Sequence, residues 1–414
     1  MKIAIVGGGI SGLVVARILS EHHEITLFEA DSRIGGHTHT VDVALEDGQY
    51  AVDTGFIVYN EATYPNFVRL LDTLGVETQP TEMSFGVTCE RTGLEWGSRG
   101  WRGILAQPGN LVRPSFLAML RDIVRFNRAT RSLLESGSSN LSLREFVKLG
   151  GFGRSLVEHY LVPMGAAIWS ADPDRFLDFP ALTFVRFFDN HGLLTTSPDL
   201  PWRVIRGGSA RYVEKLVAPF ASRVRPNSPV RAVRRVSDGV ELLVPEGRQR
   251  FDQVVLALHS DQALELHEDP SPEERKLLEA IAYQENDVVL HTDVSLLPRR
   301  PAAWASWNYR VPEQKQEGVL VTYDMSRLQG IQAAQRFLVT LNAPEGRIDP
   351  NRILGRYRYA HPVFDAAAIA AQGQHGQQSG RDRIHYCGAY WGNGFHEDGV
   401  RSALAVCKAF GADL

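Results

Sequence analysis

The chain has 414 residues, 44% of them hydrophobic and 22% charged, which is ordinary for a globular enzyme of two domains. The formal net charge of -4 excludes a generally basic nucleic-acid-binding protein. Three cysteines are too few and too scattered for a disulfide framework or a paired-cysteine metal site. The sequence starts without a signal peptide and has no apolar run of about eighteen residues, so we expect a cytoplasmic protein that does not span a membrane.

Residues 1–36 predict a dinucleotide-binding unit. Strand, glycine-rich turn, helix, strand and acid follow in order as Lys2–Val6, Gly7-Gly8-Gly9-Ile10-Ser11-Gly12, Ile10–Leu19, Ile25–Phe28 and Glu29. In such a turn Gly7 permits the tight bend, Gly9 lets a pyrophosphate approach the backbone, and Gly12 lets the helix pack on the strand. The helix N-terminus offers N–H groups to the phosphates, and Glu29 can accept hydrogen bonds from the adenosine ribose.

The next region is strongly basic. We expect a strand at Tyr50–Val58 and a helix at Pro65–Leu74 before it. Residues 91–154 then hold ten Arg and one Lys against four acidic residues. Within them the spacing predicts a helix over Phe116–Leu134, with one face turned inward that comprises Leu117, Leu120, Val124 and Leu133 or Leu134.

The other face of that predicted helix carries Arg121, Arg125, Arg128 and Arg131. A solvated surface is one interpretation. We favour a peripheral contact with an anionic membrane through Arg121, Arg125 and Arg128, since each basic group contributes about 1 kcal/mol near anionic headgroups.

The second half predicts alternating strands and helices. The expected strands are Val230–Val236, Val240–Val244, Phe251–Ala257, Val288–Thr292, Val319–Tyr323 and Phe337–Leu341, with a helix at Pro272–Ala282. A last strand ends at Gly388 and precedes a helix over Glu397–Phe410. This unit lacks Gly-x-Gly-x-x-Gly, so its helix N-terminus suits a developing negative charge better than a pyrophosphate.

The segment Glu29-Ala30-Asp31-Ser32-Arg33-Ile34-Gly35-Gly36 resembles the extended FAD signature of the flavin amine oxidase superfamily, which includes monoamine and polyamine oxidases, protoporphyrinogen oxidase and carotenoid desaturases. The resemblance implies non-covalent FAD, with Arg33 neutralising the pyrophosphate and Gly35-Gly36 passing close to the flavin. His37 stands where a second Arg is usual, which argues against a typical amine oxidase. Cys387 is interpreted as a buried strand thiol, not a covalent flavin attachment.

The resemblance further implies an α/β fold in which a Rossmann-type FAD-binding domain is interleaved with an α+β substrate domain. The FAD-binding domain would comprise 1–78, 204–270 and 345–414, and the substrate domain 79–203 and 271–344. The residues predicted to bind the cofactor are Gly7, Gly9, Ile10, Ser11, Gly12, Glu29, Ala30, Arg33, Gly35, Gly36, His37, Thr38, Gly207, Gly208, Val230, Gly388, Glu397, Asp398, Gly399 and Val400.

Other segments are similar to one bacterial family of amine-oxidase-like FAD/NAD-binding proteins. They include Gly36-His37-Thr38, Ala167-Ile168-Trp169-Ser170 and Gly394-Phe395-His396-Glu397-Asp398-Gly399. Genes of that family tend to neighbour cyclopropane-fatty-acyl-phospholipid synthases, and a related member is implicated in desaturating methyl-branched acyl chains. The resemblance therefore implies an apolar lipid substrate, and a lipid methyltransferase is a candidate partner.

Several sequence features bear on the substrate. The chain has one dinucleotide fingerprint and no redox Cys pair, so the substrate itself is expected to supply the electrons. Between Leu277 and Gln314 there is no Lys of the kind that amine oxidases often keep near the flavin, and this disfavours amines. Residues predicted to line an apolar tunnel, with core packing as the alternative, are Trp169, Phe184, Phe188, Asn190, Trp304 and Trp307.

Three residues are candidates to accept a proton during substrate oxidation: His191, Tyr309 and His361. For each, a structural hydrogen bond is the alternative role. His37 and His39 have no third ligand at metal spacing, so no metal is expected. The favoured function is a flavin-dependent desaturation of a modified phospholipid acyl chain, with hydride transfer to flavin N5. An amine or polyamine oxidase, and a non-catalytic FAD-binding partner of a lipid methyltransferase, are the alternatives.

Overall fold

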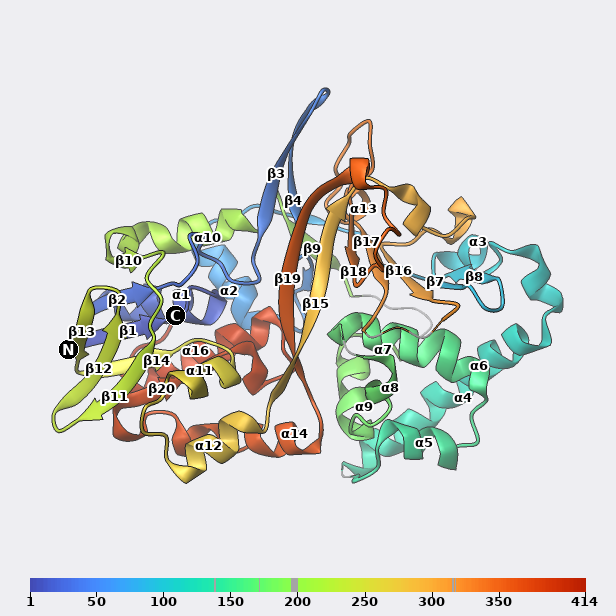
Figure 1. Ribbon diagram of the computed structural model, residues 1–414. Helices are drawn as coiled ribbons and strands as arrows, with labels where there is room; N and C mark the ends of the chain where they lie inside the picture. The colour runs from blue at the N-terminus through green and yellow to red at the C-terminus, as the bar shows by residue number, and fades with distance from the viewer. Residues whose placement is uncertain (138, 171, 195–199, 315, 317) are drawn as a thin grey trace.

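The computed structural model describes residues 1–137, 139–170, 172–194, 200–314, 316 and 318–414. They form an α/β fold with two large sheets, and the long strands β15 and β19 run between the two halves of the molecule (Figure 1). The predicted fold class is thereby confirmed. Among the described residues, no helix is both long and apolar enough to cross a membrane.

A five-stranded parallel sheet forms the centre of one half. Its strands, in spatial order, are β10 (Val224–Arg225), β2 (Glu24–Phe28), β1 (Lys2–Val6), β14 (Gln253–Leu256) and β20 (Ile384–Tyr386). Ile3, Ala4 and Ile5 of β1 are fully buried, as expected for a strand covered on both faces. The helices of this half are α1 (Ile10–Leu19), α2 (Pro65–Thr73), α10 (Ala210–Val217), α11 (Ser260–Leu266), α12 (Pro272–Glu279), α14 (Ala366–Gln372), α15 (His375–Gln378) and α16 (His396–Ala409).

A seven-stranded mixed sheet forms the other half. In spatial order it contains β19 (Ile353–Val363), β15 (Ala282–His291), β18 (Leu338–Leu341), β17 (Val321–Asp324), β16 (Trp307–Val311), β7 (Phe85–Cys89) and β8 (Leu94–Gly97). β15 and β19 pair antiparallel from Ala282 opposite Val363 to His291 opposite Ile353. The predicted domain boundary at residue 345 falls between these two paired strands. The predicted domain boundaries stay predictions.

Helices cover the outer side of the seven-stranded sheet (Figure 1). They are α3 (Gly100–Ile104), η1 (Pro108–Val112), α4 (Pro114–Ser136), α5 (Leu143–Leu149), α6 (Arg154–Leu156), η2 (Val157–Leu161), α7 (Val162–Trp169), α8 (Pro173–Phe176) and α9 (Ala181–Asn190). The predicted inward face of α4 is confirmed for Leu120, Leu133 and Leu134, which pack against the core, and is wrong for Leu117 and Val124, which are 47% and 52% exposed. Phe126 packs into an aromatic cluster with Phe146, Phe152 and Phe184, and this contact turns the helix away from the predicted orientation.

Smaller sheets complete the fold. They are the hairpin β3 (Thr40–Leu45) and β4 (Gly48–Asp53), the sheet β5 (Tyr59–Asn60), β9 (Trp202–Ile205) and β6 (Thr78–Pro80), and the meander β11 (Ala232–Val236), β12 (Gly239–Val244) and β13 (Gly247–Phe251). The expected strand Tyr50–Val58 ends early, at Asp53. There the buried carboxylate accepts hydrogen bonds from the Ser209 N–H at 2.8 Å and from Gln329 Nε2 at 3.0 Å, and these fix the chain outside the ladder.

Candidate active site

The glycine-rich turn between β1 and α1 leaves space for a phosphate group. Gly7 adopts φ 105°, which favours glycine, and its N–H donates to the Phe28 carbonyl at 2.9 Å. A Cβ atom at Gly12 would overlap the Gly7 carbonyl oxygen, so α1 and β1 approach closely. A Cβ at Gly9 would meet no protein atom within 4 Å, and α1 begins at the next residue. The turn therefore presents open space and free helix N–H groups, which is what a pyrophosphate requires.

Glu29 lies directly beside this turn. Its Oε2 accepts a hydrogen bond from the Gly8 N–H at 2.7 Å, and its Oε1 accepts one from the Asp31 N–H at 2.9 Å. Within the described part of the chain it forms no ion pair, so its remaining acceptor capacity fits ribose hydroxyls. Ala30 follows it, between β2 and the Arg33 loop.

The loop that carries Arg33 is fastened onto the glycine turn. The Gly35 N–H donates to the Gly8 carbonyl at 2.8 Å, while Arg33 donates to the carbonyls of Thr38 at 2.7 Å and Gly36 at 2.8 Å. No described carboxylate pairs with the Arg33 guanidinium. An unneutralised cation beside the glycine turn fits a pyrophosphate, and this role of Arg33 stays a prediction.

Helix α16 meets the start of α1. Ser11 Oγ donates to the Gly399 carbonyl at 3.1 Å, and a Cβ at Gly399 would lie 2.8 Å from the Ile10 side chain. Val400 is fully buried at this contact. The Gly388 N–H at the end of β20 donates to Ser402 Oγ of the same helix at 2.9 Å. Predicted cofactor residues from both ends of the chain thus lie together.

Both carboxylates at the N-terminus of α16 are engaged by the protein. Glu397 accepts from the N–H groups of Asn66 and Phe67 at 3.1 and 3.0 Å, so it caps α2. Asp398 accepts from the Phe395 N–H at 3.1 Å and from Arg401 at 2.8 Å, and burial raises the pKa of Asp398 to about 6. What α16 offers a cofactor is therefore its backbone N–H groups and helix dipole, which favour negative charge on a ligand.

The Gly207-Gly208 turn is joined to the hairpin β3–β4 through Asp53. Besides the Ser209 N–H, the Asp53 carboxylate accepts from Ser209 Oγ at 2.8 Å and Thr40 Oγ1 at 2.5 Å. Burial raises the pKa of Asp53 to about 6 despite these bonds. Val230 lies just before β11 and is 9% exposed. These positions fit the predicted cofactor cradle, whose assignment to individual residues stays a prediction.

An aromatic cluster stands at the N-terminus of α16. The Phe395 ring stacks on Phe187 of α9 at a centroid distance of 5.2 Å, and Phe187 lies 4.5 Å from the Trp169 ring of α7. Trp169 Nε1 donates to the Asn393 carbonyl at 3.2 Å. Phe179 lies 5.0 Å from Trp169 and is in edge contact with Phe364. We name Trp169, Phe179, Phe187, Phe364 and Phe395 the α16 aromatic cluster.

The other predicted tunnel residues are not part of this cluster. Phe184 and Phe188 are fully buried and stack on each other at 4.0 Å, so their burial favours the alternative of core packing. Asn190 is exposed at the end of α9. Trp307 packs edge-on against Tyr323 in the seven-stranded sheet at 5.0 Å. The substrate-binding role of these four residues stays a prediction.

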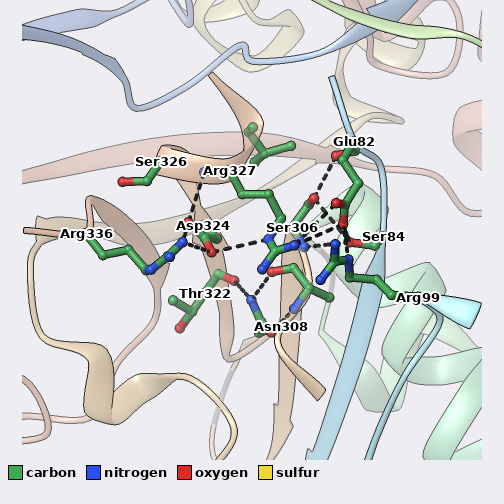
Figure 2. A network of polar contacts seen from close by, with 12 residues as sticks. Glu82, Ser84, Arg99, Ser306, Asn308, Thr322, Asp324, Ser326, Arg327 and Arg336 are labelled. Atoms are coloured by element: carbon green, nitrogen blue, oxygen red, sulfur yellow. Dashed lines mark hydrogen bonds and ion pairs between the residues drawn. The ribbon is translucent and has the colours of Figure 1, made fainter. Parts of the chain in front are cut away.

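Trp304 contacts a polar network in the seven-stranded sheet through Arg336. The Arg336 guanidinium lies 5.3 Å from the Trp304 ring centroid and donates at 2.7 Å to Asp324, whose carboxylate is fully buried. Arg327 contacts both Asp324 and Glu82, and Ser306 Oγ donates to the Glu82 carbonyl at 2.6 Å. Figure 2 shows the side chains of Glu82, Ser306, Asp324, Arg327 and Arg336 turned toward one another. Trp304 is thus held by contacts that stabilise the sheet.

The three candidate proton acceptors differ in what their surroundings allow. His191 Nδ1 lies 2.9 Å from the Phe187 carbonyl, which can only accept, so Nδ1 carries the proton and Nε2 keeps a lone pair. Among the described residues, the hydrogen-bond partner of Nε2 is Thr63 Oγ1 at 3.4 Å. The ring stacks on Phe187 at 3.9 Å, beside the α16 aromatic cluster. Burial lowers the pKa of His191 to about 4, which keeps it neutral.

His361 has the opposite tautomer. Asn286 Nδ2 donates to His361 Nδ1 at 3.0 Å, and the Asn286 amide is oriented because its Oδ1 accepts from Asn342 Nδ2 at 2.7 Å. The neutral ring therefore carries its proton on Nε2, which disfavours the predicted role of proton acceptor and suits a donor. Tyr309 lies in β16, 4% exposed, with Val87 and Val321 as its strand neighbours.

Around His361 lies an imidazole group that the sequence reasoning missed. The rings of His361 and His259 have centroids 5.5 and 5.9 Å from that of His37, and Tyr359 lies 5.4 Å from it. His37 Nε2 bonds the Ala360 carbonyl at 3.1 Å, and His39 Nδ1 bonds the Tyr359 hydroxyl at 2.8 Å. No motif marks His259 or Tyr359. The His259 ring stacks on Tyr283 of β15 at 4.3 Å, and β15 pairs with β19, which carries Tyr359 and His361. The sequence also did not predict the place of Phe395 in the α16 aromatic cluster.

Known proteins resemble this chain along its whole length. The family described as flavin containing amine oxidoreductase matches residues 10–409. Canine amine oxidase [flavin-containing] A is 42% identical over 77 residues, which is 18% of this chain and 14% of that protein. The carotenoid phi-ring synthase of Streptomyces griseus is 27% identical over 283 residues, 62% of this chain and 52% of that protein.

A solved structure of the same fold is the CLA-producing fatty acid isomerase from P. acnes, with a TM-score of 0.69 and 15% identity over 99% of this chain and 98% of that one. This chain spans about half of the length of the Streptomyces griseus relative and 14% of the length of the canine one. The glycine turn, Glu29, Arg33 and α16 supply the donor set that FAD requires, and FAD is the cofactor of this family. The chain belongs to the flavin containing amine oxidoreductase family and is an FAD-dependent oxidoreductase.

Proposed function

We propose that this enzyme dehydrogenates an apolar substrate, a modified or methyl-branched fatty acyl chain carried by a phospholipid. The observation that carries the proposal is the α16 aromatic cluster. Four of its rings are buried, Trp169, Phe179, Phe187 and Phe364, and Phe395 is half-buried, so together they form an apolar region at the N-terminus of α16, where Glu397 and Asp398 are both engaged by protein partners. A hydrocarbon chain fits such a wall, whereas a substrate ammonium gains no carboxylate partner from either acid.

The cofactor would be held by the residues already described. The N–H groups at the start of α1 and the Arg33 guanidinium bind the pyrophosphate, and the Glu29 carboxylate binds the ribose. The N-terminal backbone N–H groups of α16 would favour negative charge on the bound flavin. FAD bound there supplies the two-electron acceptor that takes a hydride from a substrate carbon.

The protein's own part in the reaction is to receive a proton. When a hydride leaves one carbon, the neighbouring carbon must lose a proton for the double bond to form between them. We assign that proton to Nε2 of His191, which keeps its lone pair because Nδ1–H is bonded to the Phe187 carbonyl. The stacked rings of Phe187 and Phe395 beside His191 exclude water from this position.

The comparisons support the substrate class without assigning it. The P. acnes protein of the same fold is named a fatty acid isomerase, and a relative from Streptomyces griseus is named a carotenoid phi-ring synthase. A second candidate function is amine oxidation, which the 42% identity to canine amine oxidase A over 77 residues favours. The residue that follows the Gly35-Gly36 pair, His37, stands against it.

The proposal is tested by comparing the phospholipids of cells with and without the protein by mass spectrometry. The expected result is an acyl species lighter by two hydrogens that appears only with the active protein. In parallel, the purified enzyme is assayed for peroxide release with a panel of polyamines. Unchanged lipids with peroxide release would replace the proposal by amine oxidation. Unchanged lipids without peroxide would favour a non-catalytic FAD-binding partner of a lipid methyltransferase.

A further inference from the structure

Exposed apolar side chains gather on one edge of the molecule. Of nine large hydrophobic side chains that are exposed among the described residues, six lie between Trp101 and Leu149. They are Trp101 (77% exposed), Leu111 (56%), Val112 (81%), Leu117 (47%), Val124 (52%) and Leu149 (74%). This stretch, α3 through α5, lies at the outer edge of the half that contains the seven-stranded sheet, on the side away from the five-stranded sheet (Figure 1). Such clustering in a water-facing surface marks an interaction site.

Helix α4 alternates apolar and basic residues along its solvent face. Leu117, Arg121, Val124, Arg128 and Arg131 follow one another at spacings of four, three, four and three, which places them on one stripe of the helix. All five are exposed. The opposite face is buried through Phe116, Met119, Phe126 and Thr130. Helix α4 therefore exposes a stripe of apolar and cationic residues to solvent, separate from the face that packs against the core.

Neighbouring segments extend this stripe at the N-terminal end of α4 and beside its middle. Leu111 and Val112 end η1, which leads directly into α4, and the Leu117 N–H bonds the Arg113 carbonyl across the junction. At the middle of α4, Arg125 donates to the Gly150 carbonyl at 3.1 Å and so brings the end of α5, with Leu149, alongside. We name Leu111, Val112, Leu117, Arg121, Val124, Arg128, Arg131, Lys148 and Leu149 the η1–α4 surface.

The charge of this surface is predominantly positive, and Glu135, exposed four residues after Arg131, is the acidic residue on the same stripe. Arg128, Arg131 and Lys148 are exposed and form no ion pair with any described residue. Arg121 contacts Asp122, whose side chain is only 2% exposed, and remains 69% exposed itself. Nearby Glu145 is occupied in the capping box of α5. A second copy of the chain would bring like charges together, whereas an anionic bilayer complements them and accepts the apolar side chains between them.

We propose that the η1–α4 surface docks the enzyme on an anionic lipid bilayer, with Leu111, Val112, Leu117, Val124 and Leu149 entering the headgroup region and the arginines pairing with lipid phosphates. The observations behind this inference are exposure and charge, so it stands independently of the substrate proposal. The proposed surface keeps Arg121 and Arg128 of the face expected from the sequence and differs from it in one basic residue of α4: Arg125 donates to the Gly150 carbonyl and lies over the Phe152 ring, and Arg131 is included instead.

Flotation of the FAD-loaded enzyme with lipid vesicles tests the inference. Vesicles of phosphatidylcholine with phosphatidylglycerol are compared with phosphatidylcholine alone, at low and high salt. The test variants are the pairs Val112→Asp with Leu117→Asp and Arg128→Glu with Arg131→Glu. Leu354→Asp and Arg356→Glu, at exposed positions on β19, are the matched controls. Retained flavin absorbance shows that each variant is folded.

The expected result is salt-sensitive flotation of the wild type with the anionic vesicles, weakened roughly ten-fold or more by each double variant and unchanged in both controls. A wild type that stays unbound at low salt would overturn the proposal, as would double variants that bind like the wild type. Sedimentation velocity gives the remaining outcome: a dimer that the same variants dissociate would assign the surface to a second copy instead. Neither flotation nor sedimentation depends on turnover, so a negative result in these experiments does not bear on the proposed substrate.

Discussion

Asn286 fixes the tautomer of His361. Its Nδ2 donates to His361 Nδ1 at 3.0 Å, and its Oδ1 accepts from Asn342 Nδ2 at 2.7 Å. Asn342 is itself oriented by the backbone, because its Oδ1 accepts from the Asp287 N–H at 3.0 Å and its Nδ2 also donates to the Val319 carbonyl. The proton on His361 Nε2 is thus determined by a chain of amides that ends in main-chain groups.

Replacing Asn286 by Asp should reverse this tautomer. A carboxylate in place of the amide nitrogen accepts a hydrogen bond, so His361 Nδ1 becomes protonated and the charged imidazolium is stabilised. Burial and the neighbouring His37 and His259 lower the pKa of His361 to about 3, and we expect Asn286→Asp to raise it by about two units. A titration of the histidine ring signals by NMR measures the change. Asn351→Asp, at an exposed position, is the control, and an unshifted His361 would contradict the tautomer assignment.

The buried histidines should make the protein sensitive to acid. Burial lowers the pKa of His37, His191 and His259 to about 4, below the ordinary value of 6.5. Below pH 6.5 the unfolded chain binds protons that the folded one does not. Stability is therefore fully present above 6.5 and falls with pH by about 1.4 kcal/mol per unit for each such histidine. Asp53 and Asp398, with pKa values raised to about 6, act in the opposite direction but are fewer.

Urea unfolding between pH 7 and pH 5 measures this slope. His361→Asn should reduce it by close to one proton, whereas His22→Asn, at an exposed position, should leave it unchanged. An equal slope in the wild type and His361→Asn would show that His361 is charged in the folded protein.

Gly9→Ala should separate cofactor binding from folding. A methyl group at residue 9 meets no protein atom within 4 Å, so the variant should unfold at about the same urea concentration as the wild-type apoprotein. The same methyl group would stand where a pyrophosphate approaches the turn, and we expect FAD affinity to fall by roughly ten-fold or more. Urea unfolding of the apoprotein measures the first effect, and equilibrium binding of FAD to the apoprotein measures the second. Gly109→Ala, which also meets open space, is the control, and undiminished affinity in Gly9→Ala would place the pyrophosphate elsewhere.

His191→Gln should slow substrate oxidation without loss of cofactor. Without a base beside the α16 aromatic cluster, we expect the rate of flavin reduction by substrate to fall about 100-fold. Stopped-flow absorbance measures this rate under anaerobic conditions. His39→Gln is the comparison, because His39 is bonded to Tyr359 and lies outside the cluster. A normal rate in His191→Gln, with full flavin content, would assign the proton to another group.

The cofactor cradle was predictable from sequence because its geometry is local. Gly7, Gly12 and Glu29 act within one strand–turn–helix–strand unit, so their spacing alone determines where their backbone and side chains lie. Arg33 is close enough in sequence for the same reasoning to hold, and its loop bonds directly to the glycine turn.

The orientation of α4 and the contacts of His361 with distant segments were not predictable from local spacing. Leu117 and Val124 satisfy helical spacing, yet the aromatic packing of Phe126 decides which face of α4 is buried. The tautomer of His361 depends on Asn286 and Asn342, which lie 75 and 19 residues away along the chain. Only the folded strands bring these groups into contact, and no motif records it.

Anaerobic reduction of the bound flavin tests the central claim most directly. The FAD-loaded enzyme is mixed, without oxygen, with vesicles that carry candidate branched acyl chains and, separately, with polyamines. We predict that the flavin absorbance bleaches with a phospholipid and that one double bond forms per flavin reduced, while polyamines leave it oxidised. Bleaching by a polyamine and by none of the lipids would contradict the assignment of an apolar acyl substrate.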